Sequence, residues 1–135
     1  MRHINIVEMN GSEKQIAYAH DIINNHYDAF IQKAEWYDGR KAHALSKGNT
    51  AKAEESENLR NAYALAADLY AKCCNANADV LNDAHFVINE KTLGIGSLSE
   101  MCALVALNKF NADDESCSET LYFAKKYFNL NVIGF

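Results

Sequence analysis

Histidine and cysteine are the side chains of this sequence that could bind a metal ion, and their spacing does not favour it. The 135 residues include five histidines and four cysteines. The chain has neither a Cys-x-x-Cys pair nor a His-Glu-x-x-His motif, which are the short spacings that zinc sites use. His20 and His26 would fall on different faces of a helix. We therefore expect no metal ion and no cofactor.

A cysteine nucleophile is the second chemistry to consider. Cys102, with His85 as its base, is the conceivable pair, but Cys102 lies in an apolar segment where a thiol usually packs as an inert group. The sequence contains no Gly-x-Ser-x-Gly elbow, Walker loop or dinucleotide-binding fingerprint. We expect no catalytic residue and no enzymatic activity. A cryptic enzyme centred on Cys102 or on a histidine is the alternative.

A glycine-rich segment could bind an anion. Residues 94–97, Gly-Ile-Gly-Ser, precede an expected helix and could hold an anion on free backbone amides, with Lys91 nearby. A plain turn followed by a helix cap explains the same residues more simply. If the anion site exists, the protein would be a small-ligand binder, such as a sponge for a nucleotide signal, that also uses a subunit interface.

An aromatic ridge on the first long helix offers a binding surface. At about 100° per residue, four residues lie close together on one side of this helix, away from its main apolar face: Tyr18, Ile22, Ala29 and Trp36. The ridge either packs against another helix of the same fold or forms an exposed face for a partner or a second copy. The candidate partner-binding residues are Tyr18, Ile22, Trp36, Tyr37 and Arg40. Among them, Trp, Tyr and Arg are the residue types that dominate binding energy at interfaces.

The first helix is the element that must position this ridge. Ser12 and Gln15 have the spacing of a capping box, and Glu13 adds a negative charge near the positive end of the helix dipole. The helix is expected from about residue 13 to the mid-thirties or early forties. The residues that follow the cap recur at three- and four-residue steps and form one apolar face: Ile16, Ala19, Ile23, Tyr27, Phe30, Ile31 and Ala34.

Further apolar patterns predict four more helices. After a turn at residues 46–50, a second helix runs to about Lys72, and a third spans roughly residues 78–89. Gly94–Gly96 is expected to break the chain. Capping-box spacings then predict a fourth helix beginning near Ser97 and a last helix beginning near Ser116.

The overall prediction is an all-α fold. Residues 98–107 are apolar on almost every side, so the fourth helix is expected at the centre. Residues 3–9 and 130–135 alternate weakly and could pair as a short two-stranded β-ribbon at the ends of the fold. The prediction is a single domain, residues 1–135, built as a compact bundle of about five helices around a buried fourth helix.

Composition limits the possible partners. The net charge is -5, whereas nucleic-acid binders usually carry a basic stripe, so direct nucleic-acid binding is not expected. No apolar run approaches the roughly 20 residues that a membrane helix needs, and the N-terminus lacks a signal-peptide core. Cys73 and Cys74 are adjacent and poorly placed to bridge each other, which favours reduced thiols in a cytoplasm.

Within about the first 40 residues, residues 11–19 and residues 34–40 carry two motifs, and these resemble the motifs of a family of small proteins from bacteriophages, prophages and conjugative elements. Residues 11–19, Gly-Ser-Glu-Lys-Gln-Ile-Ala-Tyr-Ala, with Ile22 after them, are similar to the family motif, in which Trp is usual at the position of Tyr18 and Arg at that of Ile23. Residues 34–40, Ala-Glu-Trp-Tyr-Asp-Gly-Arg, resemble its second, Trp-containing motif and are one residue shorter. The resemblance implies a small helical accessory protein of a mobile element in a bacterial host, and it supplies no catalytic residue.

The leading hypothesis is therefore a non-enzymatic protein that acts by binding a host or phage protein complex. Its most specific form is a steric inhibitor of a host defence complex, similar to an anti-CRISPR protein. The acidic clusters at Glu54–Glu57 and Asp113–Glu115 are expected to be solvated, although either could meet a basic groove on a partner. The alternatives are the small-ligand binder and a structural homo-oligomer, which the aromatic ridge would serve equally well.

Overall fold

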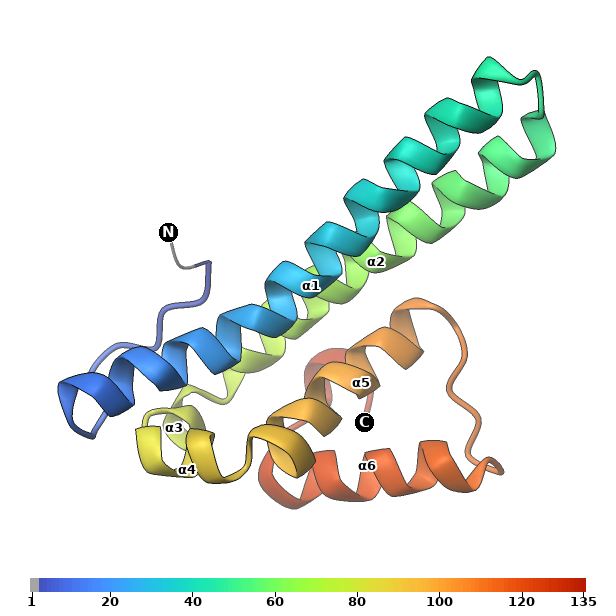
Figure 1. The fold of residues 1–135 in the computed structure, drawn as a ribbon. Coiled ribbons are helices and arrows are strands. Elements are labelled where there is room, and N and C mark those ends of the chain that lie inside the picture. The colour runs from blue at the N-terminus through green and yellow to red at the C-terminus, as the bar shows by residue number, and fades with distance from the viewer. Residues whose placement is uncertain (1–2) are drawn as a thin grey trace.

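The computed structural model describes residues 3–135, and their fold is all-α (Figure 1). Two long helices form a hairpin, and shorter helices pack against one end of it. The elements are α1 (Glu13–Ser46), α2 (Thr50–Ala76), α3 (Ala78–Leu81), α4 (Ala84–Asn89), the π-helix η1 (Lys91–Ile95), α5 (Gly96–Ala106), α6 (Glu115–Tyr127) and the 3₁₀ helix η2 (Asn131–Ile133).

The start of α1 confirms the predicted capping box. The Ser12 hydroxyl accepts a hydrogen bond from the Gln15 amide at 3.1 Å, and the Gln15 side chain accepts one from the Ser12 amide at 3.0 Å. Gly48 ends the helix, because its φ of 71° is a left-handed conformation that glycine adopts without strain. Asn49 then caps α2 by accepting from the Lys52 amide at 3.1 Å.

The far part of the hairpin projects beyond the other helices. We call residues 33–63 the arm; in Figure 1 it extends past the point where α5 approaches the hairpin. The buried residues of the arm are all alanines, Ala34, Ala44 and Ala53. Small side chains allow the two helices to lie close together, but they bury little apolar area. The arm is therefore a slender helical pair with most of its side chains exposed.

The hydrophobic core lies where the hairpin meets the shorter helices. Tyr70 is fully buried, and its hydroxyl donates to the Ile23 carbonyl at 2.7 Å, which ties α2 to α1. Helix α5 packs between α2 and α6 and buries Leu98, Met101 and Cys102. The predicted central position of this helix holds only for its first half, since residues 103–107 are half-buried.

The predicted terminal β-ribbon is wrong for the described residues, which form no strand. Residues 131–133 form η2, and the N-terminal segment makes one isolated bridge, between Asn10 and Asp83. Buried polar side chains hold that segment instead. Asn24 accepts from the amides of His3 and Ile4 at 3.1 and 2.9 Å and donates to the Ile4 carbonyl at 2.8 Å. The alternating pattern of residues 3–9 therefore does not indicate a strand. The backbone of His3 and Ile4 is held by hydrogen bonds to the Asn24 side chain instead.

The region after α2 differs most from the prediction. The helix expected at residues 78–89 is divided into two short helices, α3 and α4. The Asp83 side chain caps α4, and the Asn82 carbonyl, just before it, accepts a hydrogen bond from the Asn10 amide. Gly94–Gly96 does not break the chain, since η1 runs directly into α5. Neither of the later capping boxes forms: α5 has no side-chain cap, and Asp114 rather than Ser116 caps α6.

Candidate functional site

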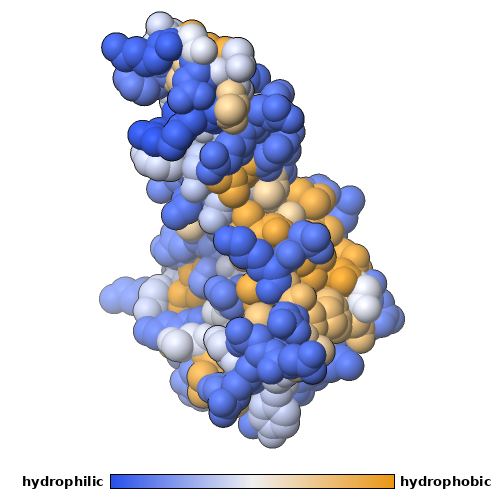
Figure 2. All heavy atoms as spheres, turned by 90° about the vertical axis from the view of Figure 1, so that its right-hand side faces the viewer, coloured by the Kyte–Doolittle hydropathy of each residue, from blue (hydrophilic) through white to orange (hydrophobic). Residues whose placement is uncertain are grey.

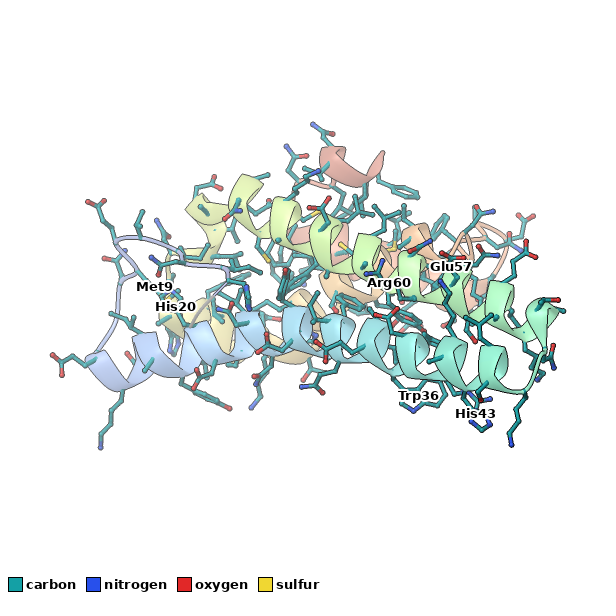
Figure 3. The ribbon with its side chains drawn as sticks, turned by 90° about the horizontal axis from the view of Figure 1, so that it is seen from above. Met9, His20, Trp36, His43, Glu57 and Arg60 are labelled. Carbon is teal, nitrogen blue, oxygen red and sulfur yellow. The ribbon has the colours of Figure 1, made fainter. Side chains whose placement is uncertain are left out.

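An exposed aromatic cluster lies on α1 within the arm. Trp36 is 56% exposed, and Figure 3 shows it, with His43, on the side of α1 that faces away from α2. The Trp36 ring meets the Tyr37 ring edge-to-face with centroids 4.9 Å apart. The Arg40 guanidinium lies 5.3 Å from the Trp36 ring centre, in a cation–π contact. This cluster combines a large accessible indole with a cation beside it.

Tyr37 contributes to the packing of the two helices of the arm and is not available as a free surface residue. Its ring is half-buried and stacks on Tyr63 of α2, with centroids 5.7 Å apart and planes 8° apart. Two ion pairs also join the helices of the arm, Lys41 to Glu57 and Arg60 to Asp38, each at 3.3 Å. Within residues 3–135, Trp36 makes no ring stacking or ion pair with α2, although it lines a hollow of about 210 Å³ with Lys52 and Glu55 of that helix. Of the two neighbouring aromatic residues, Trp36 is therefore the one whose surface is free for a partner.

Shallow hollows lie next to Trp36 and further along α1 toward the core. One, of about 460 Å³, is lined by Ala29, Gln32, Lys33 and Trp36. A second, of about 330 Å³, lies at the junction of the arm with α5, where Lys33 and Tyr63 face Ala103 and Leu107. Figure 2 shows hydrophobic side chains gathered on this side of the molecule below the arm. A partner that covered Trp36 could extend onto this junction.

The structure separates the five predicted site residues. Trp36, Tyr37 and Arg40 lie together on the arm. Ile22 is buried in the core, which excludes it from an exposed ridge. Tyr18 is 45% exposed but lies about 27 Å along α1 from Trp36 at 1.5 Å per residue, and its hydroxyl accepts from Lys91 Nζ at 3.1 Å. The ridge is interrupted because α4 also packs against α1.

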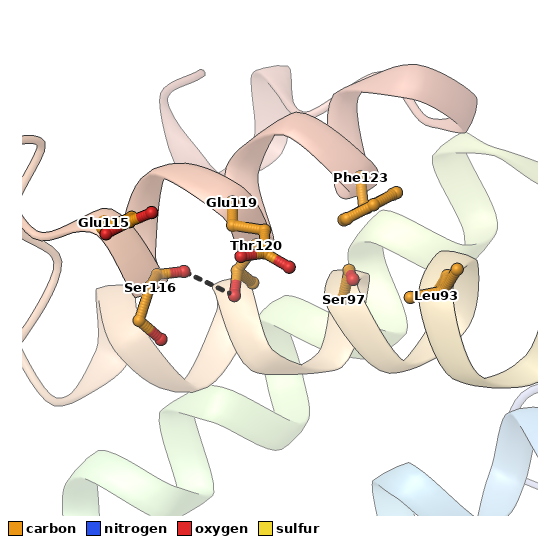
Figure 4. Close-up of a pocket in the computed structure, with 7 residues that line it drawn as sticks. All are labelled: Leu93, Ser97, Glu115, Ser116, Glu119, Thr120 and Phe123. Carbon is orange, nitrogen blue, oxygen red and sulfur yellow. Dashed lines mark hydrogen bonds between the residues drawn. The ribbon is translucent and has the colours of Figure 1, made fainter.

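A separate hollow of about 480 Å³ lies beside α6 (Figure 4). Two exposed carboxylates, Glu115 and Glu119, line it with Phe123, and the Thr120 hydroxyl donates to the Ser116 carbonyl at 3.0 Å. Among residues 3–135, no group of three histidine, cysteine or acidic side chains is placed to hold a metal ion. The hollow therefore offers two solvated carboxylates without a third ligand.

The cysteines are arranged for packing. Cys102 is fully buried, and a hydrogen bond with Cys73, together with burial, raises the pKa of its thiol. Burial also raises the pKa of Cys74 to about 12. His85, the base considered for Cys102, is exposed and pairs with Asn89 at 2.9 Å. The structure therefore does not join Cys102 to a base.

The Gly94–Gly96 segment does not present the expected free amides. The amides of Gly94 and Ile95 both donate to the Glu90 carbonyl, at 3.0 and 2.8 Å, and the Gly96 amide donates to that of Lys91. Gly94 is buried against Tyr127. Because these amides already have partners, the segment lacks the geometry of an anion site, and the small-ligand alternative loses its predicted location.

Sequence reasoning missed the contribution of residues outside the first helix. The hollow beside Trp36, Tyr37 and Arg40 is completed by residues of α2, which the hairpin brings there: Lys52, Glu55, Ser56 and Leu59. Leu107 of α5 lines the separate hollow at the junction, next to Tyr63. No helix within residues 3–135 is long and apolar enough to cross a membrane. Comparisons of the chain with family models, with curated proteins and with solved structures found no match.

Proposed function

We propose that this protein acts by binding a protein partner through the arm, with Trp36 as the central anchor. The observation that carries the proposal is a tryptophan that is 56% exposed on a projecting helical pair, with Arg40 stacked beside it. Tryptophan and arginine are enriched among the residues that contribute most to binding at interfaces. Two hollows lined by Trp36 supply adjoining surface for a partner to cover.

The mechanism is steric occlusion. At 1.5 Å per residue, the 34 residues of α1 span about 50 Å, and the arm carries its anchor well away from the core. The stacked Tyr37 and Tyr63 rings and the two interhelical ion pairs stabilise the arm as one unit. A preformed projection loses little conformational entropy on binding. The proposed role is that of a mobile-element accessory protein, and its most specific form is an inhibitor of a host defence complex, for which the resemblance of residues 11–40 is the support.

The experiment is affinity capture from a bacterial lysate with the unmodified protein and with Trp36→Ala. Trp36→Ala is preferable to a double variant that includes Tyr37, because Tyr37 stabilises the hairpin. Tyr122→Ala is the matched control, since Tyr122 is a 64% exposed aromatic residue on α6. We expect Trp36→Ala to lose the captured partner and Tyr122→Ala to retain it, with unchanged far-ultraviolet helicity in both. Equal capture by both variants would reject the arm as the binding surface.

A structural homo-oligomer is the competing role, and the exposed Trp36 favours it equally. Sedimentation of the purified protein separates the two. A homo-oligomer built on this surface would dissociate on the Trp36→Ala substitution, whereas a protein that uses the arm for a different partner sediments identically with and without the substitution.

A further inference from the structure

A basic pocket lies at the tip of the arm, beyond the aromatic cluster. It has a volume of about 280 Å³, and four of its lining residues are Arg40, His43, Lys47 and Lys52. From Arg40 to Lys52 the sequence has four lysines or arginines and no carboxylate, in a chain with 13 basic and 18 acidic residues. The tip therefore carries the opposite sign of charge to the molecule as a whole.

The cations that line this pocket form no ion pair with another residue among residues 3–135. The ion pairs of the arm involve Lys41 and Arg60, and within residues 3–135 no carboxylate pairs with Arg40, Lys47 or Lys52. The helix dipole accounts for Lys47, which caps the negative C-terminal end of α1. It does not account for Lys52, which lies in the first turn of α2, where the dipole favours an acidic residue. A cation placed against the local dipole indicates a role outside helix stability.

We propose that this pocket receives carboxylate side chains from a short acidic segment of the partner protein. Trp36 would then pack against apolar residues of the partner that adjoin this segment. The proposal rests on the partner-binding function of the arm and specifies the chemistry of its partner. Arg40 links the two parts of the surface, since it lines the pocket and also lies over the Trp36 ring. Opposite charges would steer the partner to the tip and fix its orientation.

The surroundings of the pocket favour a compact anion over a nucleic-acid strand. A nucleic-acid backbone carries one negative charge every few ångströms and would extend past the pocket along the arm. Glu54 and Glu55 lie directly beyond Lys52 on α2, and Glu55 lines the neighbouring hollow with Arg40. Glu54 and Glu55 therefore limit the cationic surface to the pocket itself. A short acidic peptide segment can place a few carboxylates there, whereas a longer phosphate backbone would run on against these two acidic residues.

Trp36 is the only tryptophan of the chain, so its fluorescence reports directly on this surface. The probe is a synthetic octaglutamate peptide, compared with a neutral peptide of equal length and with a thymidine oligonucleotide of the same net charge. We expect octaglutamate to shift the Trp36 emission in a saturable manner and the neutral peptide to leave it unchanged. The oligonucleotide is expected to bind more weakly than octaglutamate.

The variant Lys47→Gln/Lys52→Gln tests the pocket, and Lys125→Gln/Lys126→Gln is the control that removes the same charge from the exposed end of α6. We expect the first to weaken octaglutamate binding about tenfold, as the loss of two exposed charge contacts implies, and the second to weaken it less than about twofold. Equal weakening by both variants, or no saturable shift, would overturn the proposal.

Tighter binding of the oligonucleotide would overturn the proposal in favour of a nucleic-acid site. The acidic partner segment and the role of Trp36 as the anchor are tested separately. If lysate capture depends on Trp36 but octaglutamate does not bind, the acidic partner segment is wrong and the arm remains the binding surface. If octaglutamate binds at the tip but capture does not depend on Trp36, the pocket stands as a carboxylate site and the proposed anchor is wrong.

Discussion

At the residue scale, the side chains that hold the fold are polar residues that a hydrophobic pattern does not reveal. Asn24 is buried, and its side chain accepts a hydrogen bond from the Ile4 amide and donates one to the Ile4 carbonyl. Asn77 has a similar role, because its side chain donates to the Asn129 carbonyl and accepts from the Asn129 amide. An isolated asparagine in a helical sequence gives no sign of a distant backbone partner, so neither contact was predictable.

Asn24→Ala is expected to lower the free energy of unfolding by about 3 kcal/mol, because it leaves the buried amide and carbonyl of Ile4 without partners. Chemical denaturation monitored by circular dichroism measures this loss. Asn25→Ala is the control, since Asn25 is exposed on the same helix and its replacement should change stability by less than about 0.5 kcal/mol. Similar small effects for both variants would show that Asn24 does not hold the N-terminal segment.

His26 gives the fold a pH dependence. Burial lowers the pKa of its imidazole from 6.5, and the ring lies 5.8 Å from the buried Tyr70 ring. Between the two pKa values the unfolded chain binds a proton that the folded chain does not, so stability falls as the pH drops below about 6.5. The slope from this residue is at most about 1.4 kcal/mol per pH unit. Unfolding measured at pH 7.5 and 5.5 should show a smaller loss in His26→Gln than in the unmodified protein, and an identical loss would contradict the assignment.

At the element scale, the sequence predicts the long helices well and the short ones poorly. The first helix begins where its capping box indicates, and the whole predicted apolar face of α1 is buried or half-buried. The prediction ended this helix in the mid-thirties to early forties, since the apolar face that it followed stops at Ala34, whereas α1 continues to Ser46. Gly94 and Gly96 were predicted to break the chain, yet both lie in continuous helical turns. At Gly94 the reason for glycine is space, because a Cβ there would lie 2.9 Å from the Glu90 Cβ and 3.5 Å from the Tyr127 ring.

Two glycine substitutions test this difference between the elements. Gly39→Ala should raise the free energy of unfolding by about 0.5 to 1 kcal/mol, because a Cβ at this helical position meets no atom within 4 Å and alanine favours the helix. Gly94→Ala should lower it by about 1 to 3 kcal/mol, because its Cβ would lie 2.9 Å from that of Glu90 and 3.5 Å from the Tyr127 ring. Thermal unfolding of the two variants compares them directly. Stabilisation by both would show that Gly94 has room for a side chain.

At the scale of the whole molecule, the separation of core and arm is what the sequence could not predict. Helix α4 packs against α1, and Figure 1 shows the arm extending past the shorter helices with α1 and α2 side by side. The residues of α1 alone do not indicate where its contact with the shorter helices ends. Whether Trp36 is covered depends on where α5 ends against the hairpin, which is a tertiary property. The charge segregation of residues 40–52 was readable in the sequence, but its meaning depends on the hairpin turn that gathers those residues into one pocket.

The decisive measurement compares the affinity of the captured partner for the unmodified protein with its affinity for Trp36→Ala. If Trp36 anchors the interface, the substitution should weaken binding by about 30-fold or more, which corresponds to at least roughly 2 kcal/mol. Tyr122→Ala should bind as the unmodified protein does. An equal dissociation constant for the unmodified protein and for Trp36→Ala would contradict the claim that the arm is the working surface of this molecule.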